Sequence, residues 1–165
     1  MKNLYIDFDG VILDTITPVY NLAKKLNIDV KTQTNAVGLL YSKIDWETLI
    51  EESEELSNSI NSIKKLKESK KFNISILTHI NSLKEAKAKI EFVNNLFDDL
   101  TIIPVPKSCS KTMMTQTKNA ILVDDYSGNL REWEAEGGIG VKYTREYEEC
   151  EFKNVTSLEE LLELF

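Results

Sequence analysis

Cysteine and histidine are scarce in this sequence. Only two of the 165 residues are cysteine and one is histidine. Cys109 and Cys150 form no metal-ligand spacing with each other, and two cysteines do not indicate a disulfide framework. We therefore expect free thiols and a reducing compartment.

Long apolar runs are also missing. No stretch approaches the roughly 18 consecutive apolar residues that a membrane-spanning helix needs, and the apolar segment before Asp7 is too short for a signal peptide. The sequence thus predicts a cytoplasmic protein that does not bind membranes.

Positive charge is in deficit. The chain has 27 acidic and 20 basic residues, which gives a formal net charge of −7. An acidic surface repels phosphates, so binding to extended nucleic acid is not expected. A small anionic ligand remains compatible with this charge, because a bound divalent cation reverses the local field.

Apolar strand patterns alternate with amphipathic helix patterns along the chain. We expect strands at residues 2–7, 72–78, 100–105, 120–125 and 139–143, with Pro104 and Pro106 ending the third. We expect helices at residues 13–26, 45–71, 81–96, 110–117, 127–136 and 157–165, and a less regular stretch at 29–42. Such alternation is typical of an α/β protein with a doubly wound, Rossmann-like parallel sheet that is covered on both faces.

The length of 165 residues fits one domain. Residues 15–70 are too many for an ordinary connection between two strands. We therefore expect a small helical cap at 15–70, inserted after the first strand, and a core formed by 1–14 and 71–165.

Four carboxylates follow two of the expected strands. Asp7 and Asp9 end the first strand, and Asp124 and Asp125 end the fourth. Asp9-Gly10 alone would indicate a hairpin turn. However, ligands bind at the carboxyl ends of the strands in such sheets, where these residues would converge. Converging carboxylates repel one another, and Mg²⁺ would remove that cost.

Two further residues fit a phosphate site. Thr78 ends the second strand with a hydroxyl near the N–H groups of the next helix, which can hold an anion. Lys111 follows the third strand and adds positive charge, although Lys107 is an alternative. His79, the only histidine, would border the phosphate through its backbone N–H. A phosphoryl group held in this way is stabilised mainly by positioning and electrostatics.

These segments together resemble the motifs of the haloacid dehalogenase (HAD) superfamily of phosphatases. Asp7-Phe8-Asp9-Gly10-Val11 resembles the first motif, Thr78 the second, Lys111 the third and Asp124-Asp125 the fourth. They occur in the right order, and the resemblance covers residues 5 to about 143. The short chain, the helical insert and the "LVDD" segment are most similar to small nucleotidase-type members such as the 5′(3′)-deoxyribonucleotidases.

The resemblance implies a catalytic role for each motif residue. Asp7 would be the nucleophile that forms an aspartyl-phosphate. Asp9 would protonate the leaving group and then deprotonate the attacking water. Thr78 and Lys111 would hold the phosphoryl oxygens, and Lys111 would also steady Asp7. The hairpin near Gly10 would gate the pocket.

The resemblance also implies Mg²⁺ as the cofactor. Asp7 would ligate it, as would the backbone carbonyl of Asp9. Alignment with the fourth motif favours Asp125 as a direct ligand, with Asp124 close behind it. Asn129 stands where some members carry a further acidic residue.

The function implied is a Mg²⁺-dependent phosphomonoester hydrolase with a small phosphorylated substrate. A nucleoside monophosphate is the first expectation, and Tyr41 and Trp46 would either stack on its base or pack the cap. The alternatives are a sugar phosphate or other small metabolite, and a catalytically silent protein that keeps the fold. Dehalogenation is disfavoured, because that reaction does not use a metal. Asn81 is expected to cap the helix at 81–96, and no feature indicates an oligomeric state.

Overall fold

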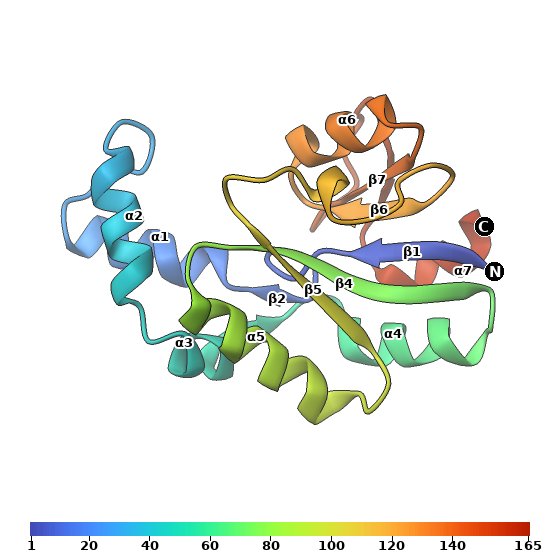
Figure 1. Cartoon of the computed structure of the whole chain (residues 1–165), viewed down its shortest axis with the longest axis horizontal. Coiled ribbons are helices and arrows are strands. Elements are labelled where there is room, and N and C mark those ends of the chain that lie inside the picture. The colour runs from blue at the N-terminus through green and yellow to red at the C-terminus, as the bar shows by residue number, and fades with distance from the viewer.

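A computed structural model describes the whole chain, residues 1–165, and is built around a six-stranded parallel sheet (Figure 1). The strands lie in the order β5-β4-β1-β6-β7-β8, and every neighbouring pair is parallel. Their bounds are β1 (Lys2–Ile6), β4 (Phe72–Ile80), β5 (Thr101–Pro106), β6 (Ile121–Asp124), β7 (Ile139–Tyr143) and β8 (Lys153–Val155). The predicted α/β fold with a doubly wound parallel sheet is confirmed.

The remaining elements are helices and one small pair of strands. The helices are α1 (Ile16–Lys25), α2 (Thr34–Lys43), α3 (Trp46–Glu52), α4 (Ser59–Glu68), α5 (Leu83–Leu96), α6 (Ser127–Ala135) and α7 (Leu161–Leu164), with 3₁₀ turns η1 (Lys111–Met113) and η2 (Leu158–Glu160). Strands β2 (Leu13–Asp14) and β3 (Glu54–Glu55) form an antiparallel pair. None of the helices combines the length and apolarity needed to cross a bilayer.

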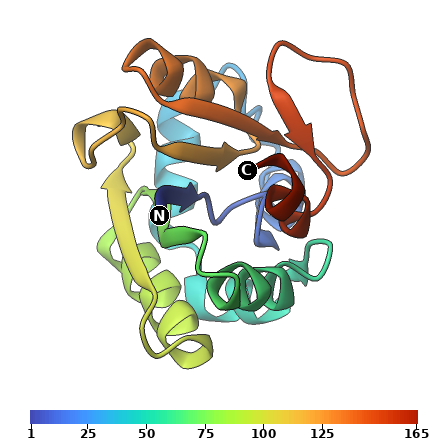
Figure 2. The ribbon, with the colours of Figure 1, turned by 90° about the vertical axis from the view of Figure 1, so that its right-hand side faces the viewer.

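Alternate residues of each strand pack on opposite faces of the sheet. In β6, Ile121 and Val123 belong to the larger core cluster, which also contains buried residues of α4, α5 and α7. Leu122, between them, packs in a second cluster with Leu130 and Trp133 of α6. Figure 2 shows α4 and α5 on one side of the sheet and α6 on the other. This double cover explains why the strands are apolar on both faces.

The strands differ from the sequence prediction at the two edges of the sheet. Pro104 does not end β5 but lies inside it, opposite Thr78. β5 is an edge strand, and an edge tolerates a residue that cannot donate a backbone hydrogen bond. At the other edge, β8 was not predicted, because it has three residues and only Val155 is buried.

The segment between β1 and β4 also differs from the prediction. Residues 29–42, expected to be irregular, contain most of α2, and the helix expected at 45–71 is interrupted by β3. Ser57 and Asn58 have positive φ angles of 43° and 54°, which a helix cannot contain. Figure 1 shows α1 and α2 beyond the carboxyl end of β1, whereas α4 returns to pack beside β4.

Candidate active site

The carboxyl ends of β1 and β6 define the candidate site. From β1 the chain moves outward through β4 and β5 on one side, and later through β6, β7 and β8 on the other. A reversal of this kind leaves a crevice at the strand ends. The Asp7 backbone N–H donates to the Val123 carbonyl, 2.9 Å away, and so ties the two ends together. Side-chain oxygens of Asp7, Asp124 and Asp125 all lie within 4.8 Å of one another.

Lys111 lies directly beneath these carboxylates. Its ammonium is 2.9 Å from Asp7 Oδ1 and 2.7 Å from Asp124 Oδ2, and the residue is 1% exposed. Lys107, the alternative, lies on the wall of the adjoining cavity instead. Burial opposes the charge of Lys111, but Asp7 and Asp124 outweigh burial and raise its pKa. Lys111 is therefore a fixed positive charge at the floor of the site.

The Asp7 carboxylate is buried and held in a single orientation. Its Oδ1 accepts the Phe8 N–H at 2.8 Å as well as the Lys111 ammonium. Burial raises the pKa of Asp7 well above its ordinary value, Lys111 opposes the rise, and the neighbouring aspartates add to it. The acidic cluster is therefore under electrostatic strain that a cation would relieve.

Asp124 and Asp125 differ in what surrounds them. Asp124 accepts hydrogen bonds from Lys111, from Asn129 Nδ2 at 2.8 Å and from the Tyr126 N–H at 2.8 Å. The Asp125 carboxylate accepts no hydrogen bond from the protein and borders the cavity. Burial, with the charge of Asp124, raises the pKa of Asp125 to about 7. Asn129, at the position where some members of the family carry a further acidic residue, donates to Asp124 and also lines the cavity.

Asp9 points into a separate hydrogen-bond network. Thr15 Oγ1 donates to Asp9 Oδ1 at 2.6 Å, and the Lys89 ammonium lies 2.6 Å from Asp9 Oδ2. Thr78 Oγ1 also donates to Oδ2, at 3.3 Å. Burial alone would raise the pKa of Asp9, but Lys89 and Thr15 outweigh burial and lower it. Asp9 is thus held as an anion beside the acidic cluster.

Lys89 was missed by the sequence prediction. It is fully buried, and its ammonium reaches Asp9, Glu85 Oε1 at 2.8 Å, Thr78 Oγ1 at 3.1 Å and the His79 carbonyl at 2.9 Å. One signal was present in the sequence. Lys89 follows Ala86 by three residues, so it lies on the apolar face of an amphipathic helix, where a lysine requires buried partners.

Thr78, His79 and Asn81 lie along the end of β4 and the turn that follows it. Thr78 is fully buried, and β4 continues past it to Ile80. His79 lines the cavity with its ring Nε2 3.0 Å from the Cys109 carbonyl, and burial, aided by Lys111, lowers its pKa. The prediction that Asn81 caps α5 is wrong. Ser82 is the N-cap, with Oγ accepting the Glu85 N–H at 3.1 Å.

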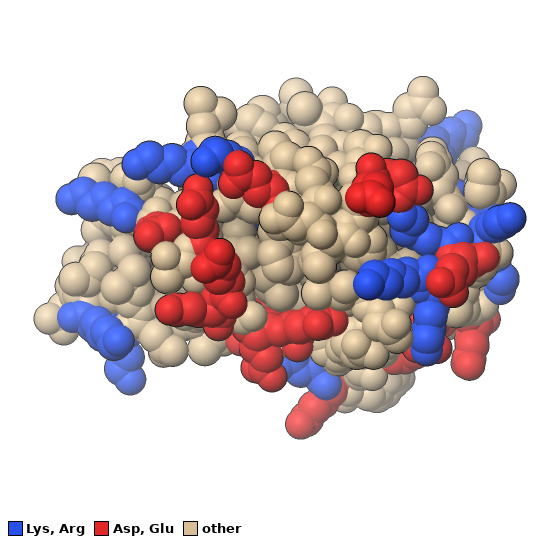
Figure 3. Space-filling model, turned by 90° about the horizontal axis from the view of Figure 1, so that it is seen from below, with Lys and Arg blue, Asp and Glu red and all other residues tan.

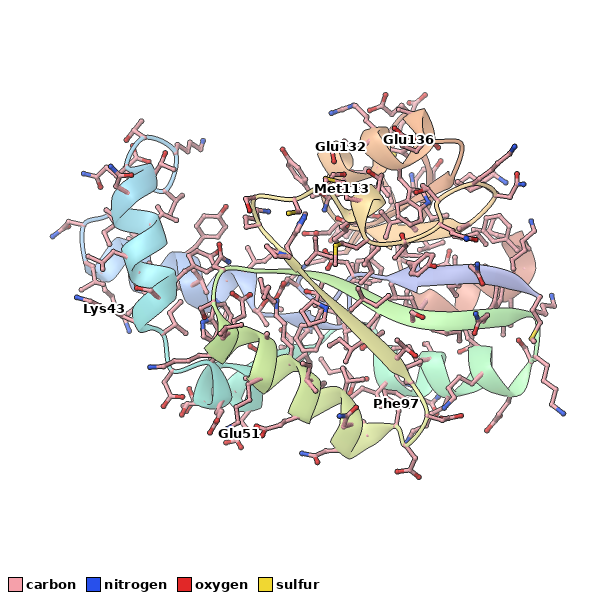
Figure 4. The ribbon with its side chains drawn as sticks, in the orientation of Figure 1. Lys43, Glu51, Phe97, Met113, Glu132 and Glu136 are labelled. Atoms are coloured by element: carbon pink, nitrogen blue, oxygen red, sulfur yellow. The ribbon has the colours of Figure 1, made fainter.

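A cavity of about 580 Å³ opens above the carboxylates. Asp7, Asp9 and Asp125 lie at its base, and its walls come from α1, α2 and the start of α6. The apolar and aromatic lining residues are Ile16, Val19, Tyr20, Val37, Tyr41, Trp46 and Tyr126. The outer sides of α2 and α3 carry exposed residues such as Lys43 and Glu51 (Figure 4). The cavity thus lies between the helices α1 and α2 and the carboxyl end of the sheet.

Comparison with known proteins supports the fold. No family model matches the sequence, and no curated protein matches it. The structure is similar to a HAD-superfamily hydrolase of subfamily IA from Geobacter sulfurreducens, with a TM-score of 0.66, 13% identity and coverage of 100% of both chains. It is also similar to a HAD phosphatase from Thermococcus onnurineus, with a TM-score of 0.64, 16% identity and coverage of 99% of this chain and 97% of the other.

A third similar structure contains a metal ion. The HAD-hydrolase YfnB from Bacillus subtilis, bound to magnesium, matches with a TM-score of 0.63 and 13% identity, covering 99% of this chain and 97% of that one. Identities this low show the fold alone. The chain thus has the fold of the HAD-superfamily hydrolases, with an acidic cluster and a buried lysine at the carboxyl edge of its sheet.

Proposed function

We propose that this protein is a HAD-type phosphomonoester hydrolase that depends on Mg²⁺ and acts through an aspartyl-phosphate. The observation that carries the proposal is the arrangement of Asp7 between the Lys111 ammonium, 2.9 Å away, and the acidic pair Asp124-Asp125. A carboxylate in this position can attack phosphorus while the Lys111 ammonium on one side, and a cation held by the acidic pair on the other, would stabilise the phosphoryl oxygens.

The residues present fit a magnesium ion. Asp7, Asp124 and Asp125 supply hard oxygen atoms, and the Asp125 carboxylate accepts no hydrogen bond from the protein. Asp7 and Asp125 would bind the ion directly with the Asp9 carbonyl, and Asp124, occupied by Lys111 and Asn129, would orient the site. Bound Mg²⁺ would neutralise charge on the acidic cluster and on the phosphoryl oxygens.

The chain's own groups account for both halves of the reaction. An Asp7 oxygen forms a bond to phosphorus as the bond to the leaving oxygen breaks. The leaving oxygen takes a proton from Asp9, which, as an anion in the free site, must first take up that proton from solvent. Asp9, now a carboxylate, takes a proton from water, whose oxygen attacks phosphorus and releases Asp7 and inorganic phosphate. Thr78 and Lys111 hold phosphoryl oxygens, and the His79 backbone borders them.

The cavity favours a nucleoside monophosphate as the substrate. Its volume of about 580 Å³ is in the range of small-molecule sites. Tyr20, Tyr41 and Tyr126 offer aromatic surface on its wall. Trp46 is 3% exposed, its indole N–H donates to the Tyr41 carbonyl at 3.2 Å, and it packs beside the Tyr41 ring. We assign base contact to Tyr41 and a supporting role to Trp46.

The predicted division of the chain into a core and a helical cap is consistent with a nucleotide substrate. With a core at 1–14 and 71–165 and a cap at 15–70, the core would supply the phosphate chemistry and α1 and α2 of the cap would select the leaving group. A sugar phosphate or another small phosphorylated metabolite is the alternative substrate, since Lys107 and Asn81 add polar groups to the same wall.

The test is turnover of p-nitrophenyl phosphate and of a panel of phosphorylated metabolites that includes ribo- and deoxyribonucleoside monophosphates. We expect activity that EDTA removes and Mg²⁺ restores, with at least one nucleotide preferred over the sugar phosphates. Asp7→Asn should lower kcat by at least about 10³-fold, because the amide is not a nucleophile.

Asp98→Asn, at an exposed position in the turn after α5, is the matched control and should leave turnover unchanged. Absence of wild-type turnover with every phosphoester would favour the alternative of a catalytically silent binding protein with this fold. A preference for a sugar phosphate would support the proposed phosphatase reaction but overturn the assignment of a nucleotide as the substrate.

A further inference from the structure

Lys89 is the most completely enclosed charge outside the acidic cluster. It projects from α5 toward the end of β4, is fully buried, and has two carboxylate partners, Asp9 Oδ2 at 2.6 Å and Glu85 Oε1 at 2.8 Å. Burying an ammonium is strongly unfavourable unless its hydrogen bonds are satisfied. Here its donors reach the two carboxylates, the Thr78 hydroxyl and the His79 carbonyl.

Glu85 belongs to the same buried network. Its Oε2 accepts the Asn81 N–H at 2.7 Å and Asn81 Nδ2 at 3.2 Å, while Oε1 contacts Lys89. Glu85 is 2% exposed, so water cannot replace the Lys89 ammonium as the partner of its carboxylate. The position of the ammonium is fixed from the helix side, so that Asp9 is the partner with freedom to move.

Asp9 has few other constraints on its carboxylate. Thr15 holds Oδ1, and Oδ2 depends on Lys89 together with the longer contact to Thr78. The Asp9 side chain is 25% exposed and lies at the base of the cavity, two residues after Asp7 in sequence but outside the Lys111 contacts. Without the ammonium, the rotation of this carboxylate would be limited by two hydroxyl groups.

We propose that Lys89 is a positioning residue for Asp9, so that the site uses two lysines with different roles. Lys111 acts on the nucleophile Asp7, and Lys89 aims the Asp9 carboxyl group at the leaving oxygen and then at the attacking water. This inference rests on the proposed phosphatase function. It predicts that loss of Lys89 impairs the proton-transfer steps far more than attack by Asp7 or phosphoryl binding, for which Lys111 remains in place and only the Lys89 contact to Thr78 is lost.

Two substrates separate these steps. An alkyl phosphate such as deoxythymidine monophosphate needs a proton on its leaving oxygen, whereas p-nitrophenolate leaves without one. Hydrolysis of the aspartyl-phosphate needs a base with either substrate. Lys89→Met should therefore lower kcat for the nucleotide by about 100-fold with KM within about threefold of wild type, in line with the usual size of general acid–base effects.

With p-nitrophenyl phosphate, Lys89→Met should give a rapid first turnover followed by slow steady-state release. The ratio of the first-turnover rate to the steady-state rate should rise at least about 30-fold over wild type, and phosphoenzyme should accumulate. A residue needed only for folding would reduce both phases together and would not change this ratio.

The double variant Glu85→Gln/Lys89→Met removes both charges of the buried pair, so it guards against misfolding of the single variant. It should show the same kinetic pattern. Lys87→Met, two residues away with an exposed side chain paired to Glu47 and Glu91, is the matched control and should behave as wild type.

An active wild type whose Lys89 variants keep the wild-type ratio and nucleotide kcat would overturn this inference and leave the phosphatase proposal standing. Parallel loss of both phases in the folded double variant would also overturn it. A wild type without turnover would overturn both proposals.

Discussion

Gly10 is the residue at which backbone geometry and the acidic cluster meet. Its φ is +72°, in the left-handed region that favours glycine, and a Cβ there would overlap with an Asp125 carboxylate oxygen and press on Ile16 at 2.9 Å. The Gly10 N–H donates to the Leu13 carbonyl at 2.8 Å, which closes the turn between the first motif and β2. Asp9-Gly10 thus begins a tight turn and not a hairpin, since β2 pairs with β3, and this turn lies directly beside the acidic cluster.

Gly10→Ala should consequently damage both activity and stability. The strained backbone alone costs about 1–2 kcal/mol, and displacement of Asp125 should reduce Mg²⁺-dependent turnover by at least about tenfold. Chemical unfolding and a Mg²⁺ titration of activity measure the two effects. Gly38→Ala in α2, where a Cβ meets nothing within 4 Å, is the stability control and should stabilise by up to about 1 kcal/mol. Equal unfolding midpoints for wild type and Gly10→Ala would contradict the strain argument.

The site residues that could be predicted from the sequence are those that directly follow a strand of the parallel sheet. Asp7 and Asp124 follow apolar strands, and a parallel sheet brings such ends together, so their proximity followed from the pattern. The buried position of Lys89 beside the site could not be predicted in this way. It depends on how α5 is rotated about its axis, because that rotation brings Lys89 to its partners Asp9 and Glu85. A sequence pattern places a residue on a face but does not identify what that face meets.

At the scale of elements, the start of α5 illustrates a similar limit. Asn81 and Ser82 are both good N-cap residues, and only the backbone geometry distinguishes them. Ser82 has extended dihedrals and accepts the Glu85 N–H, whereas Asn81 donates to the Glu85 side chain from one position earlier. By contrast, Ser157 and Glu160 form a capping box at the start of η2, inside the stretch 157–165 that was predicted to be helical.

Ser82→Ala should therefore destabilise the protein by about 1 kcal/mol, the usual value for loss of an N-cap. Asn81→Ala should cost less, because the backbone N–H of residue 81 still donates to Glu85. Urea unfolding of the two variants side by side gives the comparison. A larger loss for Asn81→Ala would show that the side-chain contact with Glu85 matters more than the cap.

The elements between β1 and β4 were the least predictable part of the fold. Strands β2 and β3 have two residues each and pair across 39 intervening residues (15 to 53), so no local pattern marks them. Their pairing brings the chain back beside the site, where the Leu56 N–H donates to the Ile12 carbonyl at 3.0 Å. Short strands defined by a distant partner are set by tertiary contacts and not by intrinsic preference.

At the scale of the whole molecule, charge is distributed unevenly. Figure 3 shows acidic side chains across the middle of the face formed by α3, α4 and α5, with basic side chains toward both ends. With a net charge of −7, the surface as a whole does not attract phosphate groups. Under the proposed function, attraction for a phosphorylated substrate would come from Lys111, from Lys107 on the cavity wall and from a cation held by the acidic cluster.

The acidic cluster also predicts how stability depends on pH in the absence of metal. Burial and Asp124 raise the pKa of Asp125 to about 7 in the folded protein, and the pKa of Asp7 is raised as well, whereas an unfolded aspartate titrates near 3.9. Between about pH 4 and 7 the folded state keeps protons that the unfolded state has lost. The free energy of unfolding must then fall as pH rises through this window. The lowered pKa values of Asp9 and Asp14 act below about pH 4 and do not oppose the trend. The lowered pKa of His79 acts in the opposite direction below about pH 6.5, because the unfolded histidine keeps a proton there that the folded one has lost, and it offsets part of the decrease.

In EDTA, the free energy of unfolding should decrease by roughly 2–4 kcal/mol between pH 5 and pH 7.5. Millimolar Mg²⁺ should remove most of the decrease, because a cation replaces the protons that the carboxylates lose and binds only the folded site. Urea unfolding at several pH values, with EDTA or with Mg²⁺, measures both effects. Asp125→Asn is the control, since its amide does not titrate, and its EDTA profile should be distinctly flatter. The opposite result would be a wild-type free energy of unfolding that stays constant or increases with pH in EDTA. It would show that the Asp7 and Asp125 carboxylates do not repel each other at close range, as the proposed magnesium site requires.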